Sequence, residues 1–259
     1  MRRALMSLLM PALMPLASIL LLLAVWQAAA LTVGGRLLPG PVVVAEALLR
    51  EAESGALFHH MGVTLLRVLA AFALAMSIGV GLGLPMGRSP FIDRLFGPWL
   101  VFFLNLPALV VIVLAYVWFG LTEAAAVGAV AVNKIPNTVV LVRAGARAID
   151  EGLIDMARVY RLSPADRLRH VLLPQLTPTI AAAARSGLAL IWKIVLVVEL
   201  LGRSDGVGFQ INLLFQTFDV AGILAYTIAF VAVVQLLEYG VLQPVERRCQ
   251  RWRRMPAEA

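Results

Sequence analysis

The sequence predicts an all-α, polytopic integral membrane protein, because the chain is too apolar and too poor in charge for a soluble domain. Hydrophobic residues make up 61% of its 259 residues and charged residues 14%, and the mean hydropathy is +0.89. A typical soluble domain is nearer half apolar and a quarter charged. The apolar residues form about six stretches, each near the roughly 20 residues that a helix needs to cross a bilayer. The length leaves room for a single transmembrane domain over residues 1–259, with short loops.

The predicted spans follow from the apolar runs and from the breaks between them. The first contains the run from Ile19 to Trp26, and the third and fourth are joined by a very short turn at 120–123. A helix-like run over 42–57 precedes the second span, and an amphipathic run over 211–218 precedes the sixth. The six spans cover about residues 12–31, 64–86, 97–119, 124–146, 178–201 and 220–243.

The first span has an alternative interpretation as a cleaved signal peptide. Arg2 and Arg3 precede the apolar run, and Gln27-Ala-Ala-Ala30 imitates a cleavage site made of small residues. The apolar run is long for a signal peptide, and its retention keeps the number of spans even. We therefore expect a retained span.

The distribution of Lys and Arg predicts the orientation of the chain. With the N-terminus in the cytoplasm, 15 of the 22 Lys and Arg residues fall in cytoplasmic segments, and only Arg36, Arg50 and Arg203 fall outside. Cytoplasmic loops carry an excess of Lys and Arg, so both termini and the loop at about 147–177 are expected inside. The same bias accounts for the net charge of +7 without a nucleic-acid partner. The single cysteine, Cys249, excludes an intrachain disulfide.

The loop at 147–177 is the most charged internal segment of the chain. Apolar residues recur at helical spacing over 151–160, which predicts a short helix. Ser163, Pro164 and Asp166 then form a variant capping box that starts a second helix of about 164–172. Pro174 and Pro178 are expected to end this helix and to open the fifth span. One face of this loop is apolar and the other is charged. The residues alone leave two functions open: a surface for a soluble partner, or a connector that lies on lipid headgroups.

The segment Asp155–Pro174 resembles the "EAA" loop of ABC importer permeases, which docks onto a cytoplasmic ATPase. Asp155 stands for the usual Glu, Met156 for the first Ala, Ala157 for the second and Arg161 for the usual Gly, and Leu173-Pro174 matches the end of the loop. Further stretches resemble the sulfonate, nitrate and taurine branch of these permeases: 64–72, 79–87, 106–107, 118–120, 198–200 and 206–208.

This resemblance implies a type I ABC importer permease fold in the bacterial inner membrane. It also implies an ATPase subunit that binds the ATP, a second permease copy in a homodimer, and an extracytoplasmic substrate-binding protein. The implied solute is small and anionic, like a sulfonate, nitrate or taurine. The ATPase-docking residues would be Asp155, Met156, Ala157, Arg161, Leu173 and Pro174.

Polar groups inside the predicted spans are candidates for a translocation pathway, because a charge at the bilayer centre costs about 2.5–3.5 kcal/mol on insertion scales. Lys134 lies in the middle of the fourth span, and Lys193 and Glu199 lie in the fifth. Asn105 lies two residues before Pro107 in the third span, where this segment could bend the wall of the pathway. A snorkelling lysine or an interhelical hydrogen bond would explain these residues equally well. The resemblance places Glu199 near the outer mouth, as a gate or a support of the fold.

Two alternatives to a permease are a membrane-embedded enzyme and a passive channel. Gly202-Arg-Ser204-Asp-Gly206 fits the G-x-S-x-G pattern of hydrolases, but it follows a membrane helix, and His170 is predicted on the other side of the membrane. His59 and His60 are expected to be solvated loop residues rather than metal ligands. A passive channel would not need a docking loop. The chain lacks a P-loop motif, so no cofactor is expected in it and ATP must be bound elsewhere.

Overall fold

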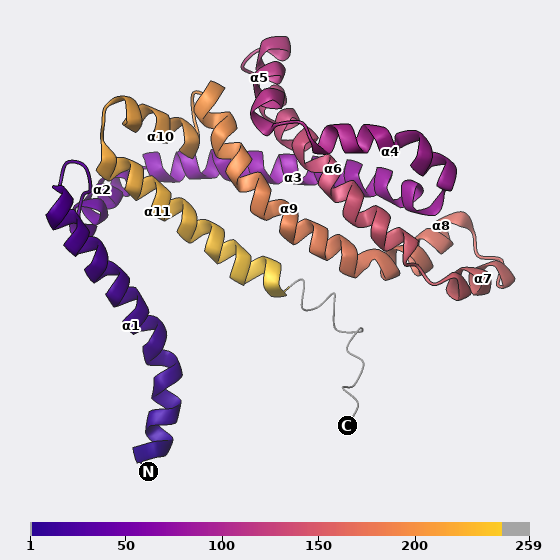
Figure 1. The fold of residues 1–259 in the computed structure, drawn as a ribbon, viewed down its shortest axis with the longest axis horizontal. Coiled ribbons are helices and arrows are strands. Elements are labelled where there is room, and N and C mark those ends of the chain that lie inside the picture. The colour runs from indigo at the N-terminus through magenta and orange to yellow at the C-terminus, as the bar shows by residue number, and fades with distance from the viewer. Residues whose placement is uncertain (1, 245–259) are drawn as a thin grey trace.

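The computed structural model describes residues 2–244, and this part of the chain is helical and contains no strand (Figure 1). Two short π-helical stretches occur in this part of the chain, η1 between α8 and α9 and η2 after α11. The elements are α1 (Arg2–Val33), α2 (Pro41–Glu53), α3 (Ala56–Arg88), α4 (Pro90–Leu104), α5 (Ala108–Phe119), α6 (Glu123–Arg147), α7 (Glu151–Val159), α8 (Pro164–Arg167), η1 (Leu168–Leu172), α9 (Leu173–Gly202), α10 (Val207–Gln216), α11 (Val220–Leu237) and η2 (Glu238–Leu242).

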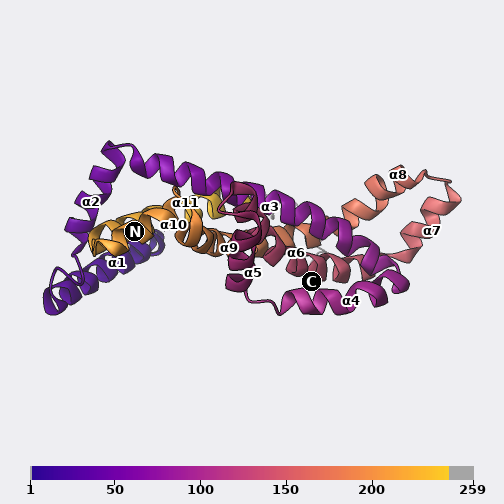
Figure 2. The same cartoon turned by 90° about the horizontal axis from the view of Figure 1, so that it is seen from above.

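The centre of the molecule is a bundle of α3, α6 and α9, which lie side by side in both views (Figures 1 and 2). Three glycines spaced four residues apart let α3 approach α6 closely: Gly79, Gly83 and Gly87. A β-carbon added to them would lie 2.5, 2.8 and 2.5 Å from the β-carbons of Thr138, Val142 and Ala146, respectively. Small residues permit close helix packing in lipid, so the overlapping G-x-x-x-G steps serve packing inside this chain.

The predicted number of about six spans agrees with the helices. Within residues 2–244, four helical segments are long and apolar enough to cross a membrane, at 56–88, 123–147, 164–202 and 220–241. The pair α4 and α5 passes the same test together, and the apolar part of α1 is the shorter stretch Ala17–Val33. The second span begins earlier than predicted, because α3 continues through His59 and His60 to Ala56.

The third predicted span, 97–119, is broken in the middle. The helices α4 and α5 meet at 94° across the segment 105–107. Pro107 lacks an N–H and restricts Leu106 to extended conformations, so α4 ends at Leu104 and a new helix starts after Pro107. The side chain of Asn105 turns back to donate a hydrogen bond to the carbonyl of Val101 at 2.7 Å.

The predicted two-helix loop is present, but its second helix does not end at Pro174. The helix that starts at Pro164 continues through η1 into α9 and ends only at Gly202. A π-helical turn widens the backbone over 168–172, directly before Pro174, and π-turns accommodate local irregularity within a continuous helix. The fifth predicted span is therefore the second part of a longer helix.

The two ends of the molecule carry different elements. The loop with α7 and α8 lies at one end of the long axis, and α2 and α10 lie at the other (Figures 1 and 2). The helix α1 extends away from the bundle, and its Trp26 donates a hydrogen bond to the carbonyl of Pro39 at 3.0 Å near α2. Surfaces at the two ends can therefore meet different partners.

Candidate functional site

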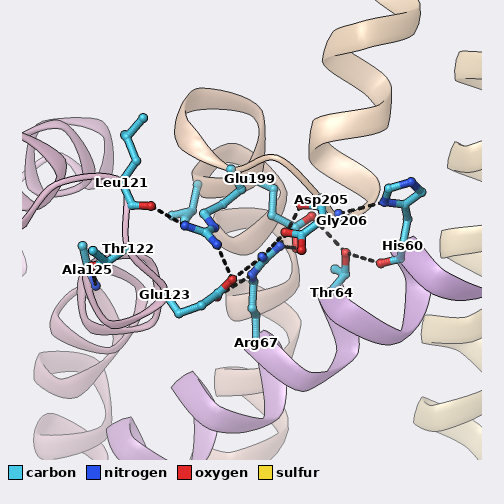
Figure 3. Close-up of polar contacts among 12 residues, drawn as sticks. His60, Thr64, Arg67, Leu121, Thr122, Glu123, Ala125, Glu199, Asp205 and Gly206 are labelled. Carbon is cyan, nitrogen blue, oxygen red and sulfur yellow. Dashed lines mark hydrogen bonds and ion pairs between the residues drawn. The ribbon is translucent and has the colours of Figure 1, made fainter.

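A cluster of charged side chains lies at the end of the bundle that carries α2 and α10, with Arg67 at its centre (Figure 3). We call it the Arg67 cluster; it comprises His60, Thr64, Arg67, Glu123, Glu199, Asp205 and Gly206. Arg67 is only 4% exposed. Its Nη1 donates to Glu199 Oε1 at 2.9 Å and to the carbonyl of Asp205 at 2.8 Å. Its Nε and Nη2 donate to the Glu123 carboxylate at 2.9 and 2.6 Å, and Nη2 also pairs with the Asp205 carboxylate. All five N–H donors of the guanidinium are used.

Glu199 is fully buried and its charge is compensated on both oxygens. One oxygen accepts from Arg67, and Oε2 accepts from the Thr64 hydroxyl and from the N–H of Gly208, each at 2.9 Å. A buried carboxylate is tolerated only when it is paired and hydrogen-bonded in this way. Glu199 therefore joins α9 to α3 and to the start of α10.

The start of α10 is held by side chains from other helices. Gly206, its N-cap residue, supplies no side-chain hydrogen bond, and the first N–H groups of a helix need partners. The N–H groups of Gly206, Val207 and Gly208 donate to His60 Nδ1 at 3.1 Å, Thr64 Oγ1 at 2.8 Å and Glu199 Oε2 at 2.9 Å. Three consecutive backbone donors are thus satisfied by two residues of α3 and one of α9.

Both glycines of this turn are required by the geometry. Gly206 has a φ of +104°, and a β-carbon there would lie 2.3 Å from Cδ of Glu199. A β-carbon at Gly208 would lie 2.2 Å from the carbonyl oxygen of Leu196. The Arg67 cluster is therefore a structural lock between four helices.

The structure does not support a hydrolase site at the segment 202–206. Ser204 is exposed in the turn after α9, and no strand precedes it in the described part of the chain. His170 lies in η1, at the other end of the molecule (Figure 1). The expectation of two solvated loop histidines is wrong for His60, which is buried in α3 and binds the Gly206 N–H.

The α7 loop, residues 148–172, is shaped by local capping. The side chain of Asp150 accepts the Gly152 N–H at 2.8 Å and starts α7, and Ser163 accepts the Asp166 N–H at 3.1 Å and starts α8. After α7 the N–H of Leu162 returns to the carbonyl of Ala157 at 3.0 Å. This bond requires a left-handed residue between them, and Arg161 has a φ of +52°. The position where the resembled loop has glycine is therefore a left-handed position here.

The predicted docking residues of this loop divide into buried and exposed groups. Ala157 is fully buried and packs with Ile154, Val171 and Leu176. Asp155, Met156, Arg161 and Leu173 are exposed, and Asp155 pairs with Arg158 at 2.7 Å. Met156 and Pro174 lie on the wall of a groove of about 500 Å³, whose lining is Gly145, Ala148, Leu153, Met156, His170, Val171, Pro174, Gln175, Pro178 and Thr179.

The loop is also tied to the bundle by an ion pair at its base. Arg88, at the end of α3, donates to Glu151 at 2.7 Å. This hydrogen bond holds the pKa of the Glu151 carboxyl below its ordinary value. The pair keeps the start of α7 next to α3.

The remaining candidate pathway residues are not brought together. Lys134 is 2% exposed and lies against α9, where a β-carbon at Gly187 would be 2.9 Å from its Cε. Lys193 lies on the exposed face of α9, and Asn105 is exposed at the break between α4 and α5. Neither lysine has a hydrogen-bond or ion-pair partner within residues 2–244. Glu199 belongs to the Arg67 cluster, so it pairs with Arg67 and not with Lys193.

Arg67, Thr64 and His60 were not predicted from the sequence as members of one site. The available signal was Arg67 itself, because an ionisable residue inside a span implies a partner. Its partners Glu123, Glu199 and Asp205 lie 56 to 138 positions away along the chain, so the pairing needed the fold.

Comparisons with known proteins agree with this architecture. Residues 75–241 match the family described as binding-protein-dependent transport system inner membrane component. The chain is 32% identical to the aliphatic sulfonates transport permease SsuC of Escherichia coli (strain K12), over 89% of this chain and 88% of that protein. It is 27% identical to the taurine transport system permease TauC of the same strain, over 83% and 80%, and 31% identical to the riboflavin transport system permease RibX of Chloroflexus aurantiacus, over 91% and 88%.

Solved structures share the fold. The inward-facing MetNI methionine ABC transporter aligns with a TM-score of 0.58 at 20% identity, over 71% of this chain and 93% of that one. An amino acid ABC transporter solved with histidines aligns with a TM-score of 0.60 at 23% identity, over 78% and 97%. The helical architecture, the family match and these likenesses lead to one conclusion: the chain belongs to the binding-protein-dependent inner membrane components and is the permease subunit of an ABC importer, a transport subunit that works with a separate ATPase and a substrate-binding protein.

Proposed function

We propose that the α7 loop is the surface on which the ATPase docks. The observation that carries this proposal is an exposed apolar surface at the tip of an otherwise charged loop. Met156, Val159 and Tyr160 are all exposed there, Tyr160 to 74%, and Met156 lies on the groove that Pro174 also lines. The loop has its own core around Ala157, so it can transmit a push from a partner to α6 and α9 as a unit. Asp155, Arg161 and Leu173 are also exposed in this region of the chain and would complete the contact.

The docking proposal is tested by capture of the ATPase subunit. Met156→Asp should reduce co-purification of the ATPase at least several-fold, while leaving membrane yield and thermal unfolding unchanged. The matched control is Leu37→Asp, an exposed apolar residue near α2 at the opposite end of the molecule, which should leave capture intact. Undiminished capture by the Met156 variant would remove the loop from the docking surface.

We propose the orientation in which the α7 loop and both termini are cytoplasmic and the Arg67 cluster faces outward. The Arg distribution supports it: Arg88, Arg143 and Arg147 end the helices next to the α7 loop, and the loop itself holds Arg158, Arg161, Arg167 and Arg169. Cys249 lies outside the described residues and provides the test. A membrane-impermeant thiol reagent should label Cys249 only after lysis, and labelling in intact cells would reverse the orientation.

We propose that two copies of the chain form the translocation pathway between them, with the exposed face of α9 toward the partner copy. Lys193 supports this arrangement, because an exposed, unpaired lysine near the middle of a span is costly in lipid. Water and a second copy would relieve that cost. Chemical cross-linking of the intact complex after Ala189→Cys, four residues from Lys193 on the same exposed face, should give a permease dimer. Persistent absence of the dimer, together with cross-linking to no other subunit, would place this face in lipid.

We propose a small anionic solute as the substrate. Lys134 and Lys193 are cationic groups at membrane depth, and the relatives named for sulfonates and taurine handle sulfonate groups. The riboflavin permease is equally similar, so family membership alone does not choose the solute. Mass spectrometry of the solute carried by the cognate binding protein tests this proposal. A solute without an anionic group would overturn it.

A further inference from the structure

His60 is the member of the Arg67 cluster whose hydrogen bonds depend on its protonation state. Its Nδ1 accepts the N–H of Gly206 at 3.1 Å, so Nδ1 carries no proton in this arrangement. The side-chain amide of Gln210 lies 2.6 Å from Nε2. A neutral imidazole donates from its second nitrogen, and rotation of the Gln210 amide presents its oxygen to that proton. Both ring nitrogens are therefore used by α10, and only the neutral ring satisfies both.

The hydrogen bond to His60 is one of three that replace the side-chain cap that Gly206 cannot provide at the start of α10. The other two acceptors are a hydroxyl, Thr64 Oγ1, and the carboxylate of Glu199, which is ion-paired to Arg67. A protonated His60 would carry an N–H at Nδ1, directed at the N–H of Gly206. That position would change from an acceptor to a second donor, and the buried Gly206 N–H would lose its partner.

Each element packed against His60 contributes a ring or a charged group to its surroundings. His59 of α3 lies with its ring 5.1 Å away, Tyr226 of α11 lies 6.5 Å away, and the carboxylates of Glu51 from α2 and Asp205 from the turn before α10 are the charged groups that face it. Tyr226 is itself bound to Glu51 at 2.8 Å. The ring of His60 thus lies where α2, α3, α10 and α11 meet. A change in its charge therefore alters the electrostatic interactions of all four helices.

We propose that His60 is a proton-sensitive latch, which holds the start of α10 against α3 while neutral and releases it when protonated from the outer side at acidic pH. Histidine is the side chain that ordinarily titrates between pH 5 and 8. Release would expose Val207, which is fully buried in this arrangement, and would loosen the packing of α10 at this end of the bundle. The proposal rests on the proposed orientation, in which the Arg67 cluster faces outward.

The experiment measures the accessibility of Val207 at different pH values in the complete transporter in intact cells. Val207→Cys, in a background with Cys249→Ser, is labelled with a membrane-impermeant maleimide between pH 7.5 and 5.5. Ser204→Cys is the matched reference, since Ser204 is exposed in the same turn and corrects for the pH dependence of thiol reactivity. We expect the labelling ratio of position 207 to position 204 to rise at least several-fold at pH 5.5.

The variants assign the effect to one histidine. His60→Asn places an amide oxygen near the position of Nδ1 without a titratable group, so the ratio should stay low and constant across the pH range. His59→Asn changes the exposed neighbouring ring and should leave the rise intact. A constant ratio in the chain with His60, or an equal rise with His60→Asn, would overturn the latch. Failure to label Ser204→Cys in intact cells would instead overturn the orientation, and the ratio would then be measured in inverted vesicles.

Discussion

Arg67 of α3 donates a 2.9 Å hydrogen bond to Glu199 of α9, and both residues are almost fully buried, at 4% and 0% exposed. This pair joins the two helices on which the start of α10 depends. The lock is built from charges and not from apolar contacts, so removing one partner leaves the other buried without compensation.

The first prediction concerns the Arg67–Glu199 pair. Arg67→Ala and Glu199→Ala should each lower the free energy of unfolding by about 3–5 kcal/mol, as measured by thermal unfolding in detergent. The double variant should lose less than the sum of the two, because it leaves fewer uncompensated charges. The exposed pair Arg88 and Glu151 is the control, and Arg88→Ala should change stability only slightly. Additive losses for the buried pair would show that the two residues act independently.

The second prediction concerns the glycines of α3. Gly87→Ala should destabilise the protein by about 1–3 kcal/mol, because the new β-carbon would lie 2.6 Å from the backbone oxygen of Arg143, which cannot move without shifting α6. Gly81→Ala is the matched control on the same helix, since nothing lies within 4 Å of its added β-carbon. Equal unfolding temperatures for the two variants would contradict the close approach of α3 and α6.

The third prediction concerns the left-handed residue of the α7 loop. A left-handed conformation costs a residue with a side chain about 1–2 kcal/mol, so Arg161→Gly should stabilise the loop by about that amount. Arg161→Ala keeps the backbone strain and removes only the guanidinium. If Arg161 contacts the ATPase, both variants should weaken its capture, while only the glycine variant gains stability. Full capture with both variants would remove Arg161 from the proposed docking residues.

The fourth prediction separates the core of the α7 loop from its surface. Ala157→Asp should weaken ATPase capture and also lower the unfolding temperature, because the side chain enters the buried contact with Ile154 and Leu176. Val159→Asp, on the exposed tip, should weaken capture alone. An Ala157 variant with an unchanged unfolding temperature would contradict the buried position of this residue.

The sequence was most predictive where the signal is local. The length of the apolar runs predicted the long helices, and the capping residues Ser163 and Asp166 predicted the start of α8. Both features depend only on residues that are neighbours in the sequence. The break at Pro107 was foreseen as a bend, but the 94° angle depends on how α5 packs against α6. Pro174 was expected to end a helix, and a π-helical turn kept it continuous instead. The local rule for proline was overridden by the packing of α9.

The candidate site was less predictable, because its contacts are tertiary. Glu199 was singled out by its charge in a span, yet its nearest charged neighbour in sequence, Lys193, is not its partner. His60 was predicted to be solvated, since sequence alone placed it in a loop before the second span. The earlier start of α3 buries it, and the turn at Gly206 then meets its ring. Only the packing of α3 against α10 could bring these positions together.

The last prediction concerns the two lysines at membrane depth, which the structure places in different surroundings. Lys134 is buried between α6 and α9 with no ionic partner among residues 2–244, so its charge costs free energy that an apolar side chain of similar length would not. Lys134→Met should therefore raise the free energy of unfolding by about 1–4 kcal/mol. Lys193→Met changes an exposed side chain and should leave stability almost unchanged in the isolated subunit.

A transport measurement tests whether Lys134 has a function that offsets the free-energy cost of its buried charge. If Lys134 meets an anionic solute when α6 and α9 move apart, Lys134→Met should gain stability and lose transport, while ATPase capture is retained. Lys193→Met should lose transport without any gain in stability. The measurement is ATP-dependent uptake of the solute into liposomes by the complete transporter, supplied by the cognate binding protein. Normal uptake with both variants would exclude both lysines from the pathway, and the argument for an anionic solute would lose its support from this chain.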